Sequence, residues 1–63
     1  MEKKQNTMVR GHKIVWLADR EMYGIFDKVD SETYSMRELA KGYVYPDWEA
    51  NTLEEAIEWV KSN

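Results

Sequence analysis

No cysteine and only one histidine occur in this chain of 63 residues, and the lack of cross-linking residues constrains its fold more than any other feature. A domain this short buries only about 60% of the surface that its unfolded chain exposes, so many such domains use disulfides or metal ions. These residues can form neither a disulfide nor a thiolate or histidine-based zinc site. Apolar burial must therefore hold the fold together.

Aromatic residues supply much of the material for that burial, because the sequence contains three Trp, four Tyr and one Phe. Each buried aromatic side chain removes about 150–250 Å² of surface from water. Self-association is a second route to stability, since an interface between copies adds buried surface to a small core. We therefore expect an aromatic-rich core, self-association, or both.

The chain divides into a short tail and one domain. Residues 1–11 are mostly polar, so we expect a disordered tail there, followed by a single domain over residues 12–63. The longest apolar run covers residues 14–18, whereas a membrane-spanning helix needs roughly 20 apolar residues. We expect no membrane contact and, given the missing cysteines and signal peptide, a cytoplasmic location.

Two neighbouring strands are predicted in the first half of the domain. Residues 14–17 are apolar, β-branched and aromatic without alternation, which predicts a strand over residues 13–18 with both faces covered. A polar loop over residues 19–22 leads to a second strand over residues 23–29. Because the loop is short, the two strands should be antiparallel neighbours. Gly24 indicates a bulge or a close backbone approach.

A turn and a short helix are expected next. Residues 30–33 have the polar composition of a turn. Ser35 and Glu38 have the spacing of a capping box, and good helix formers follow them up to Gly42, where a left-handed cap would end the helix. The alternative is a strand over residues 34–39.

The last part of the chain predicts a strand followed by the C-terminal helix. Residues 43–45 form a short strand that ends at Pro46, which has no N–H to donate, and extended structure resumes over residues 48–50. Thr52 and Glu55 have the spacing of a second capping box. Apolar residues at helical spacing then form one stripe, with Trp59 at its margin: Leu53, Ala56, Ile57 and Val60.

The predicted fold is therefore α+β, with elements in the order β-β-α-β-α and a short first helix. The simplest packing is a small antiparallel sheet with the C-terminal helix on one face. A single helix covers one face only, so we expect the other face to be wet or to meet a partner.

Catalytic chemistry finds little support in the sequence. His12 is the only candidate base, and its position between tail and strand is typical of a solvated residue. The carboxylates fall in turns or on the outer face of the C-terminal helix, where no enclosed pocket would raise a pKa. We expect no catalytic residue, no metal site and no cofactor, and we expect that the protein is not an enzyme.

Candidate partner-binding residues lie in the last third of the chain. Tyr43, Tyr45 and Trp48 place three large aromatic rings within six residues, and Tyr and Trp dominate the energetics of protein interfaces. Trp48 is expected equally in the core or at an interface, whereas at least one of the two tyrosines is expected at an interface. An acidic face on the C-terminal helix completes the candidate set: Glu54, Glu55 and Glu58. That face serves either solubility or docking on a basic surface.

These observations favour a small protein-interaction module, acting as an inhibitor or regulator of a larger intracellular protein that remains unidentified. The net charge of −3 disfavours a general DNA binder, although residues 1–20 carry a local +3 and residues 43–63 a local −4. The alternative is single-stranded nucleic-acid binding through a basic arm and sheet aromatics. The residues concerned are Lys3, Lys4, Arg10, Lys13, Tyr23, Phe26, Tyr43 and Tyr45. A structural homo-oligomer is a further alternative.

Overall fold

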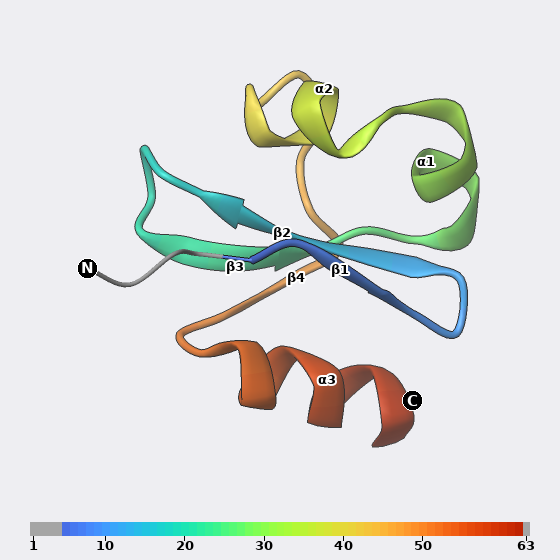
Figure 1. The fold of residues 1–63 in the computed structure, drawn as a ribbon, viewed down its shortest axis with the longest axis vertical. Helices are drawn as coiled ribbons and strands as arrows, with labels where there is room; N and C mark the ends of the chain where they lie inside the picture. The colour runs from blue at the N-terminus through green and yellow to red at the C-terminus, as the bar shows by residue number, and fades with distance from the viewer. Residues whose placement is uncertain (1–4, 63) are drawn as a thin grey trace.

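The computed structural model describes residues 5–62, which form a four-stranded antiparallel sheet with helices on both faces (Figure 1). The strands are adjacent in chain order: Thr7–Val9 (β1), His12–Leu17 (β2), Met22–Ile25 (β3) and Trp48–Ala50 (β4). Helix α3 (Leu53–Ser62) packs on one face, and helices α1 (Lys28–Thr33) and α2 (Met36–Ala40) pack on the other. The predicted α+β fold and the packing of the C-terminal helix are confirmed. The expected uncovered face is wrong, because α1 and α2 cover it.

A tight hairpin joins β1 to β2. Its two turn residues, Arg10 and Gly11, have φ angles of 51° and 85°, and two left-handed residues in a two-residue loop match the twist of the flanking strands. Val9 pairs with His12 at the end of this hairpin. The tail expected over residues 1–11 is thus wrong for Thr7–Val9, which form a strand; the first four residues lie outside the described residues.

Strand β2 runs through the centre of the fold, which explains its unbroken apolar sequence. Successive side chains of a strand point to opposite faces. Ile14 accordingly packs in the core beneath α3, whereas Val15 and Leu17 pack in the core beneath α2. All three side chains are buried. The prediction that both faces of this strand are covered is confirmed.

Strand β3 ends earlier than predicted, and a helix replaces the predicted turn. The strand expected over residues 23–29 stops at Ile25, and α1 covers Lys28–Thr33, including the residues 30–33 where a turn was expected. The reason is a cap: the Asp27 carboxylate accepts a hydrogen bond of 2.7 Å from the Asp30 N–H. An aspartate at this position satisfies an amide that the first helical turn leaves without a partner.

Buried hydrogen bonds attach α1 to β2. The Ser31 side chain is 1% exposed, accepts from the Lys13 N–H at 2.8 Å and donates to the Phe26 carbonyl at 3.3 Å. The Lys13 ammonium donates to the Tyr34 carbonyl at 2.8 Å. The hydroxyl thus partners a β2 amide at a position where the sheet is covered by a helix.

Helix α2 confirms the first capping box. Ser35 accepts from the Glu38 N–H at 3.2 Å, and the Glu38 carboxylate accepts from the Ser35 N–H at 2.9 Å. Gly42 follows the helix with a φ of 88°, as a left-handed cap requires. Leu39, on the inner side of α2, is fully buried. The alternative of a strand over residues 34–39 is wrong.

The third predicted strand is displaced along the chain. Residues 43–45 are irregular, and β4 begins only after Pro46. Pairing with β3 starts when the Asp47 N–H donates to the Ile25 carbonyl at 2.8 Å, a bond that proline at the preceding position cannot make. Trp48 then pairs with Ile25 in an antiparallel register.

Gly24 marks a close approach between β3 and its surroundings. A Cβ atom at this position would lie 2.8 Å from Leu17 Cδ1 and 3.1 Å from Pro46 Cβ. Only glycine leaves room for the chain after α2 to cross this part of the sheet. The predicted close backbone approach is confirmed.

The C-terminal helix begins with the second predicted capping box. The Thr52 hydroxyl accepts from the Glu55 N–H at 3.1 Å, and the Glu55 carboxylate accepts from the Thr52 N–H at 3.3 Å. Ala56 and Val60 are buried against the sheet, with Leu53 and other stripe residues packed beside them. The predicted apolar stripe of this helix is therefore its packing face.

Candidate functional site

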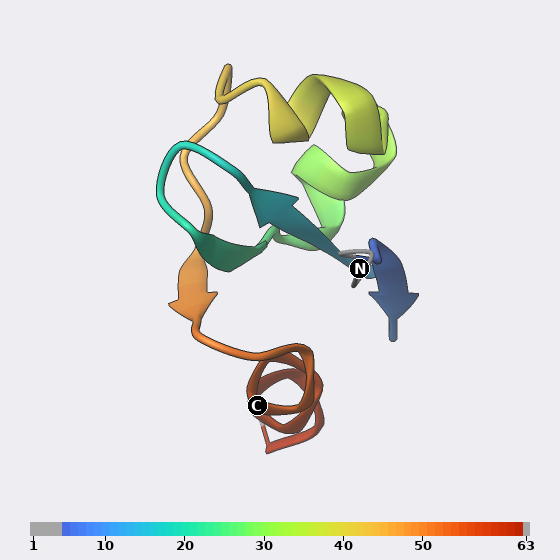
Figure 2. The same cartoon turned by 60° about the vertical axis from the view of Figure 1, so that its left-hand side comes forward.

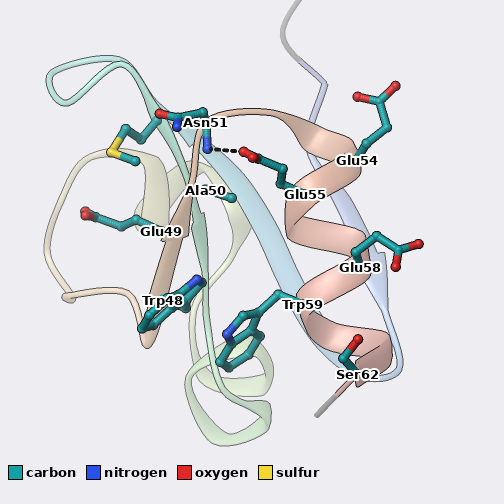
Figure 3. A pocket seen from close by; sticks show the side chains of 10 residues that line it. Trp48, Glu49, Ala50, Asn51, Glu54, Glu55, Glu58, Trp59 and Ser62 are labelled. Carbon is teal, nitrogen blue, oxygen red and sulfur yellow. Dashed lines mark hydrogen bonds between the residues drawn. The ribbon is translucent and has the colours of Figure 1, made fainter.

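Two tryptophans stack where the edge strand β4 meets α3 (Figure 3). The ring centroids of Trp48 and Trp59 are 5.7 Å apart and the ring planes differ by 11°. Trp48 pairs with Ile25, a core residue of the α3 face, but it sits on the outermost strand. It consequently remains 52% exposed. Its ring is thus available to another molecule while one neighbour holds it in place.

A groove of about 580 Å³ opens beside these rings, between β4 and α3. Its lining combines aromatic, aliphatic and acidic side chains: Met22, Trp48, Glu54, Glu55, Glu58 and Trp59. None of its lining residues is a lysine or an arginine. We call this feature the β4–α3 groove. It offers an apolar floor and a negative rim.

A second hollow of about 340 Å³ adjoins the other side of β4, where Glu49 and Pro46 lie on the same face of the sheet as Gly24. Tyr45, Pro46 and Asp47 line it together with Arg20. It shares Met22, Trp48 and Glu49 with the β4–α3 groove. Both hollows therefore adjoin the same short edge strand.

Arg20 fixes the side chains around the second hollow. Its guanidinium donates a hydrogen bond to the Glu49 carboxylate and lies 5.3 Å from the centroid of the Tyr45 ring. The hydrogen bond and charge of Glu49 raise the pKa of Arg20 above its usual value. Because this cation is already paired, the second hollow has no unpaired positive charge among its lining residues.

The three acidic residues of α3 do different things. Glu54 and Glu58 have no hydrogen-bond or ion-pair partner among residues 5–62, and Figure 3 shows their carboxylates directed away from β4. The Glu55 carboxylate accepts from the backbone N–H groups of Asn51 and Thr52, at 3.1 and 3.3 Å. Glu55 therefore caps the helix, and only Glu54 and Glu58 present carboxylates without a partner.

The structure brings most of the predicted partner-binding residues together. Trp48 and the three glutamates line the β4–α3 groove, and Tyr45 lines the second hollow with an exposed fraction of 82%. Tyr43 is 70% exposed but lines neither. Several lining residues were missing from the sequence-based set, among them Trp59 and Arg20, which contact predicted residues directly. Trp59 could have been found from the sequence, because it follows Glu55 by four residues and therefore lies on the same side of the helix, the side that faces β4.

The residues proposed for nucleic-acid binding do not form one surface in the described part of the chain. Tyr23 and Phe26 are buried, so their rings cannot stack on bases. The Lys13 ammonium is held by a backbone carbonyl, and Arg10 lies in the β1–β2 turn and donates to the Lys61 carbonyl at 3.4 Å. Lys3 and Lys4 lie outside the described residues.

His12 occupies the start of β2 and its Nδ1 lies 2.9 Å from the Phe26 carbonyl oxygen. When the ring is neutral, Nδ1 can donate to that oxygen. Within residues 5–62, histidine and acidic side chains form no group of three or more that could hold a metal ion.

Comparison with protein-family models, curated proteins and solved structures finds no significant match to this chain. Among the described helices, none is long and apolar enough to cross a membrane.

Proposed function

We propose that this protein is a protein-interaction module that binds a partner through the surface formed by β4 and α3. The observation that carries the proposal is the half-exposed Trp48 ring, stacked on Trp59 at the β4–α3 groove. Tryptophan, tyrosine and arginine supply most of the binding energy at protein interfaces. Partly ordered, exposed aromatic rings bury a large area on binding at little cost in side-chain entropy.

The position of the exposed aromatic rings supports the same surface. Trp48 and Tyr45 adjoin one edge of the sheet, on its two faces, whereas Tyr23 and Phe26 are buried. Exposed apolar groups that gather in one region, with a polar rim, are characteristic of interaction sites. A partner that covered both hollows would bury these rings together.

The charge of the surface indicates what kind of partner it suits. Glu54 and Glu58 lie at the rim without a partner among the described residues, and Glu55 adds a third carboxylate in its capping role. A basic surface would complement this rim and would be steered toward it during association. By occupying such a surface, the module would act as an inhibitor or regulator of its partner.

Affinity capture with matched variants tests the proposal. A tagged protein, its Trp48→Ala variant and its Val29→Ala variant are exposed to the same cell extract after nuclease treatment. Val29 is a suitable control because it is an apolar side chain 70% exposed on α1, on the opposite face of the sheet. We expect one protein to bind the unmodified chain and the Val29→Ala variant but not the Trp48→Ala variant.

Circular dichroism accompanies the capture, because a variant that unfolds would lose binding trivially. Removing the Trp48 ring forfeits a stacking contact worth about 0.5–1.5 kcal/mol, which should leave the fold intact. Equal capture by the Trp48→Ala variant would refute the proposed surface. Material that disappears after nuclease treatment would instead point to the nucleic-acid alternative, and dimers seen by light scattering to the homo-oligomer.

A further inference from the structure

We infer that the partner contributes an extended, basic segment, which adds as a fifth strand along the outer edge of β4. The inference rests on the proposed function and specifies how that surface is used. It follows from three features of the described chain: the edge position of β4, the two hollows on its opposite faces, and the charge of their linings.

The outer edge of β4 is open within residues 5–62. The sheet order is β1-β2-β3-β4, so β4 pairs with β3 on one side only, and Figure 2 shows β4 and β1 at opposite edges of the sheet. The backbone groups along an edge strand form a template on which another extended chain can pair. Peptide recognition by strand addition uses such an edge.

The two hollows match the side-chain alternation of a strand. Trp48 and Ala50 face α3, because they pair with core residues of that face. Glu49 pairs with Gly24 on the opposite face, and its carboxylate forms an ion pair with Arg20. Successive side chains of an added strand would point to these two faces in turn. One would enter the β4–α3 groove and the next would enter the second hollow.

The linings specify different side chains for the two positions. On the α3 face, the exposed Trp48 ring fits an arginine or lysine through cation–π contact, and the Glu54 and Glu58 carboxylates at the groove rim, although directed away from β4, add an attractive charge. On the other face, Arg20 is already paired, and the Tyr45 ring and Pro46 offer apolar contact. Asp47 also lines this hollow, but the apolar contact offered by Tyr45 and Pro46 favours a β-branched side chain there. The expected segment therefore alternates basic and β-branched residues.

Charge also argues against a second copy of this chain as the occupant. Pairing of two β4 edges about a two-fold axis would place like surfaces together. Glu54 and Glu58 of one copy would then approach the same residues of the other, and like charges facing each other are destabilising. A basic segment from a different protein removes that repulsion.

A set of synthetic peptides tests the inference on the full-length protein. The first peptide alternates arginine and valine over about seven residues, a common strand length. The second has the same composition with the arginines and valines in separate blocks. The third repeats the first with N-methylated backbone amides, which cannot donate hydrogen bonds. Binding is followed by NMR on ¹⁵N-labelled protein, through amide shifts and hydrogen exchange.

We expect the alternating peptide to shift the amides of β4 and the indoles of Trp48 and Trp59, and to slow exchange along β4. The N-methylated peptide should bind about fivefold more weakly for each backbone hydrogen bond that it cannot form. The block peptide should bind about threefold to tenfold more weakly. A Glu58→Gln variant should weaken the alternating peptide, whereas Glu32→Gln, the same change on the exposed part of α1, should not.

Three results would overturn strand addition. They are equal binding of the N-methylated and unmodified peptides, equal binding of the block and alternating peptides, and no binding of the alternating peptide at millimolar concentration. None of these three results would refute the proposed function, which the affinity capture tests separately, because a partner can depend on Trp48 without pairing as a strand. Protection of β4 amides in a dimer without peptide would assign the edge to a second copy and overturn the inference as well.

Discussion

Two regions of this sheet contain similar residue types but differ in exposure. We call the region beneath α1 and α2 the closed flank and the region along β4 the open flank. Beneath α1 and α2, Phe26 and Leu39 are fully buried, and the buried Ser31 hydroxyl has both a donor and an acceptor. Along β4, Trp48 and Tyr45 remain 52% and 82% exposed. Trp48 and Tyr45 therefore lie at the surface, whereas Phe26 and Tyr23 are buried in the core. In a chain this short, ring size did not decide which aromatics were buried.

Position in the sheet decides whether an aromatic side chain is buried or exposed. Phe26 follows the inner strand β3 and is covered by helices, whereas Trp48 lies on an outer strand that has a neighbour on one side only. The core beneath α2 closes without Trp48 or Tyr45. These rings are thus available for binding, and the comparison predicts that stability and binding can be changed separately.

The largest expected effect concerns the closed flank. Phe26→Ala should lower the free energy of unfolding by about 3–5 kcal/mol, because it removes a large, fully buried side chain and leaves a cavity. Urea denaturation followed by circular dichroism measures this loss, with Tyr43→Ala as a control of exposed aromatic character. A loss below about 1 kcal/mol would mean that this flank is not closely packed.

Gly24→Ala should be the next most damaging. The added methyl would meet Leu17 Cδ1 at 2.8 Å and Pro46 Cβ at 3.1 Å, and overpacking of this kind costs about 1–3 kcal/mol. Thermal unfolding provides the measurement. If the variant matched the unmodified protein in stability, the chain after α2 would not cross the sheet as closely as described.

The Glu55→Ala and Glu54→Ala variants distinguish the helix-capping role of one carboxylate from the exposed position of the other. Glu55→Ala removes an acceptor for two backbone N–H groups and should cost about 0.5–1.5 kcal/mol, while Glu54→Ala should leave stability nearly unchanged. Chemical denaturation of the two variants side by side gives the comparison. Equal losses would contradict the distinct roles of the two carboxylates.

The smallest effect on stability is expected at the open flank. Tyr45→Ala should change the free energy of unfolding by no more than about 0.5 kcal/mol, because the ring is largely exposed, yet it should weaken partner binding. Tyr43→Ala is the matched control, since Tyr43 is exposed but lines neither hollow. Unfolding of the Tyr45→Ala variant would show that the ring belongs to the core and would end its assignment to an interface.

Much of the fold could be predicted because its signals are local. The capping boxes at Ser35 and Thr52 involve residues three apart, so the sequence alone placed the starts of α2 and α3 correctly. The unbroken apolar run of β2 correctly indicated burial on both faces. Helix α1 was missed because Asp27 and Asp30 also suit a turn, and the Asp27 cap favours the helix together with the tertiary packing of Ser31 against β2.

The candidate site was predicted less completely, because it joins segments that are distant along the chain. The sequence suggested Trp48 and the acidic face of α3, but it did not reveal that Trp59 stacks on Trp48 or that Arg20 lies beside Tyr45 and Glu49. These contacts depend on how β4 is registered against β3 and on where α3 packs. Neither depends on residue spacing within one element.

Neighbouring residues along the chain specify the capped helices and the apolar strand, and the composition alone shows a chain without cysteine and with an acidic last third. Helix caps and apolar periodicity act over a few residues and need no other part of the chain. The tertiary structure alone decided that two helices cover the second face and that β4 lies at the sheet edge. Whether a side chain is buried depends on which element packs against its face of the sheet, and that element comes from a segment distant along the chain.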